Sequence, residues 1–139
     1  TTTYNTVTLG STAYSNNFSI VAGTQITAAV AGVYNLQISL QVRKTDSGTD
    51  TFEFWFAKNG VDIPSSNTSI KTHSNDEAVV AALNFIETLN AGDYLEIRWY
   101  SLDSFMQLLA VPAQAAVPGV SPARPAIPSA IVTIVPVGA

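Results

Sequence analysis

The residues of this chain that could carry chemistry are few, and the only histidine is His73. It lies between Thr72 and Ser74, in a polar stretch that ends at Glu77. A catalytic histidine usually activates a nucleophile, but the chain has no cysteine and no recognisable spacing of serine, histidine and carboxylate. We therefore expect His73 to be a solvent-facing loop residue, and we expect the chain to have no catalytic residue.

Two pairs of acids could supply oxygen ligands to calcium. Asp76 and Glu77 are adjacent, and Asp46 and Asp50 are four positions apart in another polar stretch. Calcium is bound by carboxylate and carbonyl oxygens, but neither spacing matches a calcium-binding loop. Turn formation and solubility are simpler roles for these acids, so the sequence predicts no metal site.

Three later acids, Glu87, Asp93 and Glu96, could pair as an acid and a base in glycoside cleavage. A β protein with ten acids offers such pairs by chance. Asp93 directly follows Gly92, where an aspartate is expected to hold a turn. The sequence therefore predicts neither a catalytic carboxylate pair nor a bound cofactor.

Aromatic side chains offer a third kind of chemistry, because Trp55, Trp99 and Tyr100 could stack on sugar rings. All three fall in stretches where apolar and polar residues alternate. Aromatic residues in such strands more often pack in a core or against another subunit. We therefore expect these three to be structural.

The composition limits the partners of the protein. Charged residues make up 12% of the 139 residues, about half the usual share, whereas hydrophobic residues make up 47%. So few charges indicate that other subunits cover part of the surface. The net charge is −4 and the six lysines and arginines form no run, which disfavours nucleic acid. No apolar run approaches the roughly 20 residues of a membrane span, so no membrane partner is expected.

The stretch from Ala31 to Arg43 has the clearest structural pattern. Polar residues alternate there with five apolar ones, which are Tyr34, Leu36, Ile38, Leu40 and Val42. Because side chains alternate between faces along a strand, this pattern predicts a long strand with one apolar and one wet face. The polar residues 44–48 supply the turn that follows. A second apolar layer must cover such a strand.

Two further stretches alternate in the same way, residues 52–56 and residues 94–101. Asn59-Gly60 follows the first and predicts a hairpin, because both residues accept the positive φ of a type I′ turn. Shorter strands are expected at residues 1–9, 18–21, 26–30 and 105–111, and around Ile70.

Residues 79–89 are apolar on both faces, with Val79, Ala81, Leu83 and Phe85 on one face and Val80, Ala82 and Ile86 on the other. Their alanines leave a helix open as an alternative, but a strand fits the surrounding pattern better. Residues 130–137 are expected to form the last strand and are also apolar on both faces, which indicates a strand that is central in its sheet or buried by a neighbour.

Residues 112–128 differ from the rest of the chain. They contain five prolines, which remove hydrogen-bond donors and fix φ. The stretch is too apolar and alanine-rich for a flexible linker, so we expect an ordered, extended insert that lies on protein. We find no true internal repeat in the chain.

Three stretches resemble one known superfamily in their order and spacing. They are GVYNL at 32–36, FWFAKNG at 54–60 and LNAGDYLEI at 89–97, and a final apolar strand follows them. Together they are similar to the tumour-necrosis-factor and complement globular-head superfamily over roughly residues 26–137. The insert at 112–128 departs from that pattern. The whole chain also resembles small jelly-roll domains of tailed bacteriophages, including phages of cyanobacteria.

The resemblance implies a fold and an assembly. It implies that residues 1–139 form a single all-β domain, an antiparallel β-sandwich jelly roll of about eight to ten strands. It also implies a homotrimer, because domains of that superfamily assemble as trimers. The trimer contacts of the superfamily map to six candidate interface residues, Tyr34, Leu36, Leu83, Phe85, Ile131 and Ile134.

Three classes of function are compatible with the sequence. The first is a non-enzymatic structural protein on the outer surface of a virion, best described as a trimeric capsid decoration or cement protein bound to the capsid shell. Residues 1–12 and 112–128 are then expected to contact neighbours. The second is a receptor- or carbohydrate-binding tip of a tail fibre or head fibre, with loops 45–50, 64–69 and 73–77 facing the host. An enzyme comes last.

Overall fold

A computed structural model describes residues 3–138 of the chain. These residues form eleven strands and no helix, which confirms the prediction of an all-β protein for this part of the chain. The strands are β1 (Asn5–Thr6), β2 (Phe18–Val21), β3 (Gln25–Ala28), β4 (Gly32–Lys44), β5 (Asp50–Lys58), β6 (Val61–Asp62), β7 (Thr68–Thr72), β8 (Ala78–Leu89), β9 (Tyr94–Ser101), β10 (Met106–Leu108) and β11 (Ala130–Pro136). Two of them, β1 and β6, have only two residues each, which accounts for the excess over the expected eight to ten.

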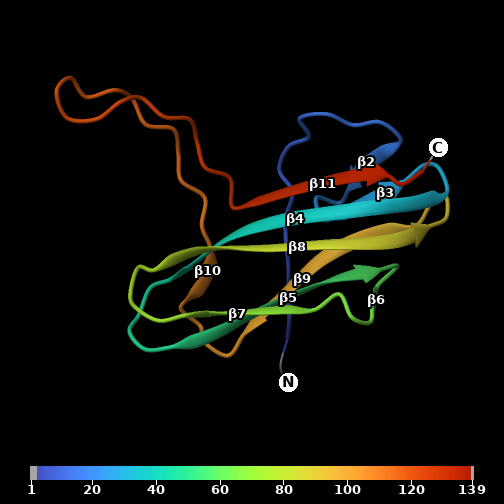
Figure 1. The fold of residues 1–139 in the computed structure, drawn as a ribbon, viewed down its shortest axis with the longest axis horizontal. Helices are drawn as coiled ribbons and strands as arrows, with labels where there is room; N and C mark the ends of the chain where they lie inside the picture. The colour runs from blue at the N-terminus through green and yellow to red at the C-terminus, as the bar shows by residue number, and fades with distance from the viewer. Residues whose placement is uncertain (1–2, 139) are drawn as a thin grey trace.

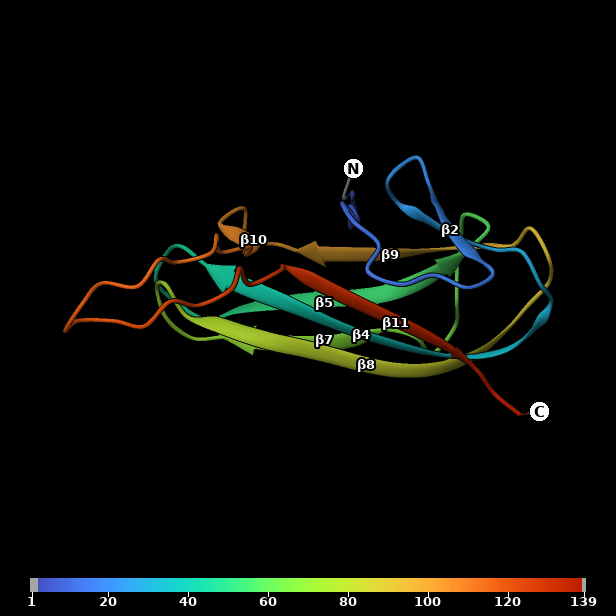
Figure 2. The same cartoon turned by 90° about the horizontal axis from the view of Figure 1, so that it is seen from above.

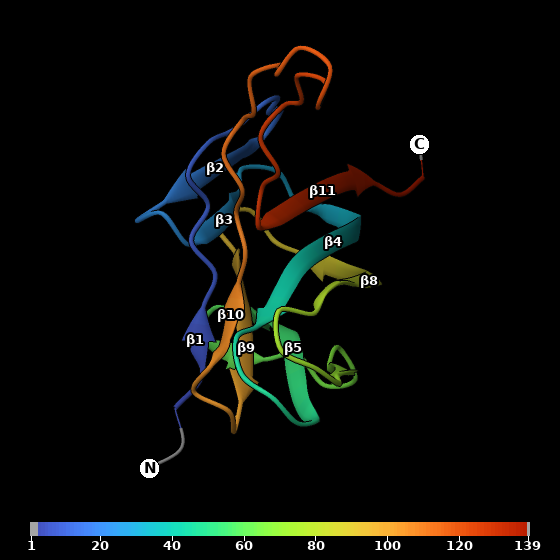
Figure 3. The same cartoon turned by 90° about the vertical axis from the view of Figure 1, so that its left-hand side faces the viewer.

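The strands form two antiparallel sheets (Figure 1). The larger sheet has seven strands in the order β2-β3-β9-β5-β6, with β1 beside β9 and β7 beside β5. In the smaller sheet β4 is central, with β8 on one side and β11 and β10 on the other. Figure 3 shows β4, β8 and β11 on one side of the molecule and β1 and β9 on the other. This arrangement is consistent with a β-sandwich.

The alternation in β4 has the predicted result. The five apolar residues of the alternating pattern are at most 5% exposed, and Leu36, Leu40 and Val42 have no exposed surface. They form one hydrophobic core with side chains of the larger sheet, which include Phe52, Phe54, Phe56, Leu95 and Ile97. The polar residues between them, such as Gln37, face outward. The sequence pattern thus identified both faces of the central strand.

Residues 78–89 form the strand β8, so the helix alternative is wrong. β8 pairs with β4 along its whole length, from Leu89 opposite Gly32 to Ala78 opposite Arg43. Alanines favour a helix only weakly, and pairing along the full edge of β4 outweighs that preference. The two apolar sets divide as predicted, so that Ala81 is buried and Val80 is 67% exposed.

The predicted hairpin at Asn59-Gly60 is confirmed. The two residues have φ angles of 52° and 82°, as a type I′ turn requires, and they join β5 to β6. The side-chain oxygen of Asn59 also accepts the Tyr94 N–H at 3.0 Å. The turn is therefore tied to the start of β9.

The predicted N-terminal strand at 1–9 is mostly wrong. Residues 1–2 lie outside the described part, and only Asn5 and Thr6 form a strand, β1. Beyond β1 the chain keeps contact with the larger sheet through single hydrogen bonds, such as that from Val7 N–H to the Ile97 oxygen at 2.9 Å. Val7 is 2% exposed and belongs to the core, so this segment is held by one buried side chain rather than by a regular ladder.

The proline-rich segment also differs from the prediction. It is extended, but it does not lie on the rest of the protein. Residues 111–128, which we call the arm, fold back on themselves between β10 and β11 and project beyond one end of the sheets (Figures 1 and 2). None of its residues belongs to the hydrophobic core. The chain pairs with itself there because no neighbouring strand is within reach.

Candidate interaction surface

The outer face of the smaller sheet carries more apolar surface than a solvated sheet normally does. An antiparallel sheet that faces water usually alternates polar residues outward along every strand. β4 follows this rule from Asn35 onward, but β8 presents Val80 and Ile86 at 67% and 59% exposure, and β11, an edge strand rather than a central one, presents Ile131 and Val135 at 53% and 47%. We call these four side chains the outer apolar surface. Side chains of this size are candidates for a contact with another molecule when they gather on one face.

A groove of about 510 Å³ lies in this face. Its lining comes from all three strands and includes Gln37, Ser39, Ala82, Asn84, Ile131 and Thr133. Each of the three strands contributes both polar and apolar groups to the lining, with Asn84 from β8 and Thr133 from β11 among the polar ones. A mixed lining of this kind can both bury area and hydrogen-bond to a partner.

The six predicted interface residues occupy three different environments. Tyr34 and Leu36 lie in the core of the chain, with 5% and 0% exposure, so they have almost no surface for a partner. Leu83, Phe85 and Ile134 are half-buried and pack against the core from the two flanking strands. Only Ile131 belongs to the outer apolar surface. The structure therefore separates core from surface where the sequence could not.

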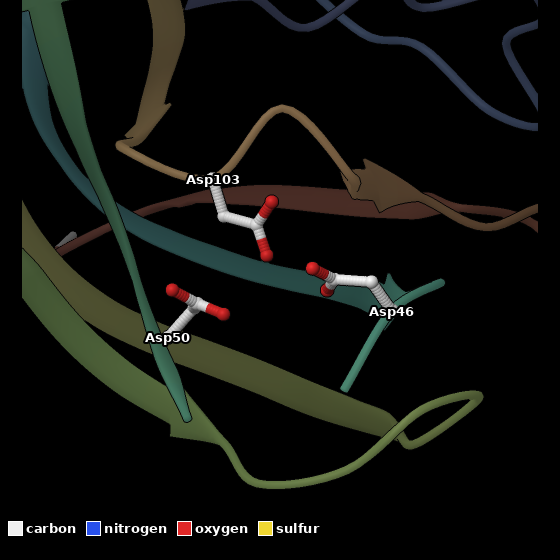
Figure 4. Close-up of side chains that lie close together, drawn as sticks. All are labelled: Asp46, Asp50 and Asp103. Atoms are coloured by element: carbon white, nitrogen blue, oxygen red, sulfur yellow. The ribbon is translucent and has the colours of Figure 1, made fainter. Parts of the chain in front are cut away.

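A cluster of carboxylates lies at one end of the sheets, where Asp46, Asp50 and Asp103 come together (Figure 4). Their oxygens lie within 4.8 Å of one another, as metal ligands would. The ammonium of Lys44 already lies among them. It donates to Asp50 and to the Gly48 oxygen, and its Nζ is 3.5 Å from Asp46 and 3.8 Å from Asp103. The cluster thus has the geometry of an ion-pair site that holds a buried lysine.

Burial and charge act on Lys44 in opposite directions. Its side chain has no exposed surface, and this desolvation lowers its pKa. The hydrogen bond to Asp50 and the charges of Asp46 and Asp50 outweigh desolvation, so the pKa of Lys44 is raised above its usual 10.5. The sequence assigned Lys44 to an exposed turn. Its position was nevertheless readable, because it continues the inward-facing alternation of β4 by one more step.

The other acids considered for chemistry hold turns or ion pairs. Glu77 accepts the N–H groups of His73 and Ser74, and the bond from His73 lowers the pKa of Glu77. Asp93 accepts from Asn59 and from the Asn90 N–H, at 2.9 and 2.8 Å, and these bonds lower the pKa of Asp93. The predicted turn role of Asp93 is confirmed.

Ion pairs account for three more of these acids. Asp76 pairs with Arg43, Glu87 lies 2.9 Å from Lys58, and Glu96 lies 3.8 Å from Arg98. Each of these acids therefore pairs with its own cation, and the three are not arranged around one substrate.

His73 and the aromatic residues are placed as follows. His73 is exposed in the loop after β7, as predicted, with its Nδ1 3.5 Å from the Thr49 hydroxyl. Trp99 stacks on Phe52 at the edge of the core. Trp55 faces outward and donates to Asp62 at 2.8 Å, and Tyr4 meets its ring edge-on. Tyr100 lies opposite Glu53 on the same outer face of the larger sheet.

The arm has a three-residue period that the sequence analysis missed. Its chain pairs with itself through reciprocal N–H to carbonyl bonds at Val111–Ile127, Gln114–Arg124 and Val117–Ser121, all between 2.8 and 3.0 Å. The paired residues are less exposed than the residues between them, except at the tip. A polyproline II helix has three residues per turn, so this period is the one expected of two polyproline II segments side by side.

Proline and glycine explain the shape of the arm. Every proline of the arm directly follows a paired residue, at a position where no N–H is needed, namely at 112, 118, 122, 125 and 128. At the tip, Val117-Pro118-Gly119-Val120 forms a turn closed by the Val120 N–H on the Val117 oxygen, and Gly119 has φ of 73°. The spacing of prolines 122, 125 and 128 was the signal for a repeat, because it equals one polyproline II turn.

Comparisons of the sequence with family models and with curated proteins identify no relative. No protein-family model matches the chain, and no curated protein sequence matches it. The resemblance to the tumour-necrosis-factor superfamily and to phage domains therefore stays a prediction. Within residues 3–138, no helix is both long and apolar enough to cross a membrane.

Proposed function

We propose that this protein is a non-enzymatic structural protein of a tailed-phage virion, a homotrimeric jelly roll that decorates the outside of the head. The observation that carries the proposal is the outer apolar surface on β8 and β11. Both strands are edges of the smaller sheet, and exposed edge strands with apolar side chains are prone to pair with other chains. A closed trimer covers such edges, and the burial of apolar area contributes roughly 25 cal/mol per Å² before association costs.

The chemistry of the chain supports a structural role rather than catalysis. The acids at positions 46, 50, 76, 77, 87, 93, 96 and 103 are engaged in ion pairs or turns, and His73 lies in an exposed loop. The arm adds a second attachment element. A stiff projecting hairpin with an apolar exterior suits a protein that binds its neighbours in a particle, here the capsid shell and adjacent trimers.

One observation disfavours the rival function, a fibre tip that binds a receptor or glycan. Its three candidate loops do not form one face. β5 and β7 are paired, with Asp50 opposite Thr72 and Phe54 opposite Thr68. Loops 45–50 and 73–77 therefore flank one end of this pair, and loop 64–69 lies at the other end (Figure 1). A receptor surface made from all three is thus not available on one side of the molecule.

Oligomeric state tests the first part of the proposal through a matched pair of valines. Val80 and Val61 are exposed by 67% and 70%, and they lie on the smaller and the larger sheet respectively. Val80→Asp is expected to convert the trimer to monomers in light scattering, because it places a charge in the interface. Val61→Asp is expected to leave a trimer. A monomeric wild-type protein at micromolar concentration would refute the trimer.

Copy number tests the second part. A decoration protein covers the capsid lattice, so quantitative mass spectrometry of purified virions is expected to find many trimers per particle. A reconstruction of the virion should place them on the head surface. Only a handful of trimers, located at the tail or at one vertex, would support the fibre function instead.

A further inference from the structure

The arm carries a charge that the chain leaves without a partner. Arg124 is the only charged residue of the arm, and it makes no ion pair with any residue from 3 to 138. Its guanidinium donates only two long hydrogen bonds, each of 3.3 Å, to the oxygens of Pro112 and Pro125. A guanidinium has five N–H donors in a planar fork that fits a carboxylate. Most of its binding capacity is therefore unused.

A groove on the larger sheet has the complementary features. It measures about 430 Å³, lies on the outer face near the ends of β5 and β9, and is lined by Thr49, Asp50, Thr51, Glu53, Tyr100 and Leu102. Glu53 stands out among the described carboxylates, because it neither accepts a hydrogen bond nor pairs with a cation there. Leu102 is 90% exposed, although it is a large apolar side chain.

The shape and chemistry of the groove fit a polyproline II helix. Proteins bind such helices in grooves where aromatic side chains pack against proline rings. Tyr100 and Leu102 supply the apolar side of this groove, and Glu53 supplies a free carboxylate. The arm offers proline rings on its exposed faces and one free guanidinium. Because prolines fix its backbone in advance, the arm loses little conformational entropy on binding.

We propose that the arm of one copy of this protein docks into the groove at residues 49–53 and 100–102 of a second copy, with Arg124 bound to Glu53. The net charges favour this partner: outside the arm the chain has five lysines and arginines against ten acids, so a positive arm is attracted to another copy. The arm cannot fold back onto its own groove in the observed conformation, because it projects away from the sheets (Figure 2). This inference rests on the proposed function in one respect, because it requires that copies of the protein meet in a particle.

The absence of cysteines makes the contact directly measurable. Two single-cysteine variants, Ala123→Cys in the arm and Thr51→Cys in the groove, are co-expressed with different tags and oxidised, so that Arg124 and Glu53 both stay in place. We expect a disulfide-linked pair that carries both tags. A matched variant with Asn90→Cys, an exposed position in the turn between β8 and β9, is expected not to link to Ala123→Cys. Equal linking to both positions, or no linking to either, overturns the proposal.

Charge reversal gives a second readout on chains without cysteine. Arg124→Glu is expected to weaken self-association beyond the trimer by about tenfold or more in sedimentation velocity. Adding Glu53→Arg to the same chain should restore self-association. Lys71→Glu is the control. Lys71 lies on β7 beside β5 and has no ion pair within the described residues, so reversing its charge should not weaken association.

The outcomes separate this inference from the proposed function. An unchanged association constant in Arg124→Glu refutes arm docking while leaving the decoration role in place, in which case the arm binds another virion protein. A low copy number in the virion refutes the decoration role while leaving a cross-link in pure protein intact.

Discussion

The two sheets and the arm both consist of extended chain, but different forces stabilise them. In the sheets, side chains alternate between two faces, and one face is buried in a common core. In the arm, only every third residue pairs, and the prolines between the paired residues fix the backbone. The sheets are therefore stabilised mainly by hydrophobic burial. The arm is stabilised by a few hydrogen bonds and by the small entropy that a proline-rich chain loses on folding.

This difference has a functional consequence. Burial makes the two sheets one cooperative unit, so a defect in their core affects the whole domain. The arm adds no side chain to that core, so its sequence can change to fit a partner at little cost in stability. In such a protein the two sheets determine the stability of the fold, and the arm can bind a partner without contributing to that stability. Three variants test this difference, in order of decreasing expected effect.

The largest effect is expected in the core of the sheets. Leu36→Ala removes a side chain with no exposed surface, which should cost about 2–5 kcal/mol of the free energy of unfolding through lost burial and a cavity. Urea denaturation measures the loss. Gln37→Ala, at the next and exposed position of β4, is the control and should change stability by less than about 0.5 kcal/mol. Similar losses in both variants would contradict the assignment of the two faces.

A smaller effect is expected at the turn held by Asp93, and it depends on pH. Because hydrogen bonds from Asn59 and Asn90 lower the pKa of Asp93 in the folded state, its contribution is present above its unfolded pKa of 3.8. The contribution is lost as the pH falls through the lowered value. Asp93→Asn should therefore be less stable than the wild type at neutral pH, and the difference should shrink in acid. Thermal melts from pH 7 down to pH 2 measure it, and a constant difference would contradict the role of the charge.

The smallest effect on stability is expected from the arm. Replacing residues 112–126 by a short glycine-serine turn should change the free energy of unfolding by less than about 1 kcal/mol, because loop-closure entropy varies slowly with length. Trimer formation should persist. A large drop in the melting temperature would show that the arm is part of the folding unit after all.

The alternating strands were predictable because their signal is local. In β4, β5 and β9 the alternation of apolar and polar residues indicates which face is buried. The turn at Asn59-Gly60 requires only that these two residues accept positive φ angles. The strand state of β8 was also predicted, although its alanines allowed a helix. Its pairing with β4 settled the choice.

The surface and the site were less predictable. Six interface candidates were mapped from the trimer contacts of the resembled superfamily, yet Leu36 is in the core and Ile131 is on the surface. Both are large and aliphatic, so composition cannot separate them. Val80 and Leu102, two exposed apolar residues, were not singled out because exposure depends on what other strands cover.

The sequence by itself determined most of the strands, the turn at Asn59-Gly60 and the inward-facing residues of β4, β5 and β9, because these follow from backbone geometry and side-chain type within a few residues. Only the tertiary structure decided three other features. Lys44 is buried because two aspartates that follow it closely in the chain, Asp46 and Asp50, and the distant Asp103 after β9 surround it. The outer apolar surface exists because no other strand covers β8 and β11. The arm projects because its two halves pair with each other at every third residue, beside the prolines, where the sheet has ended. Each depends on how segments of the chain meet or fail to meet in space, and the local pattern does not encode this.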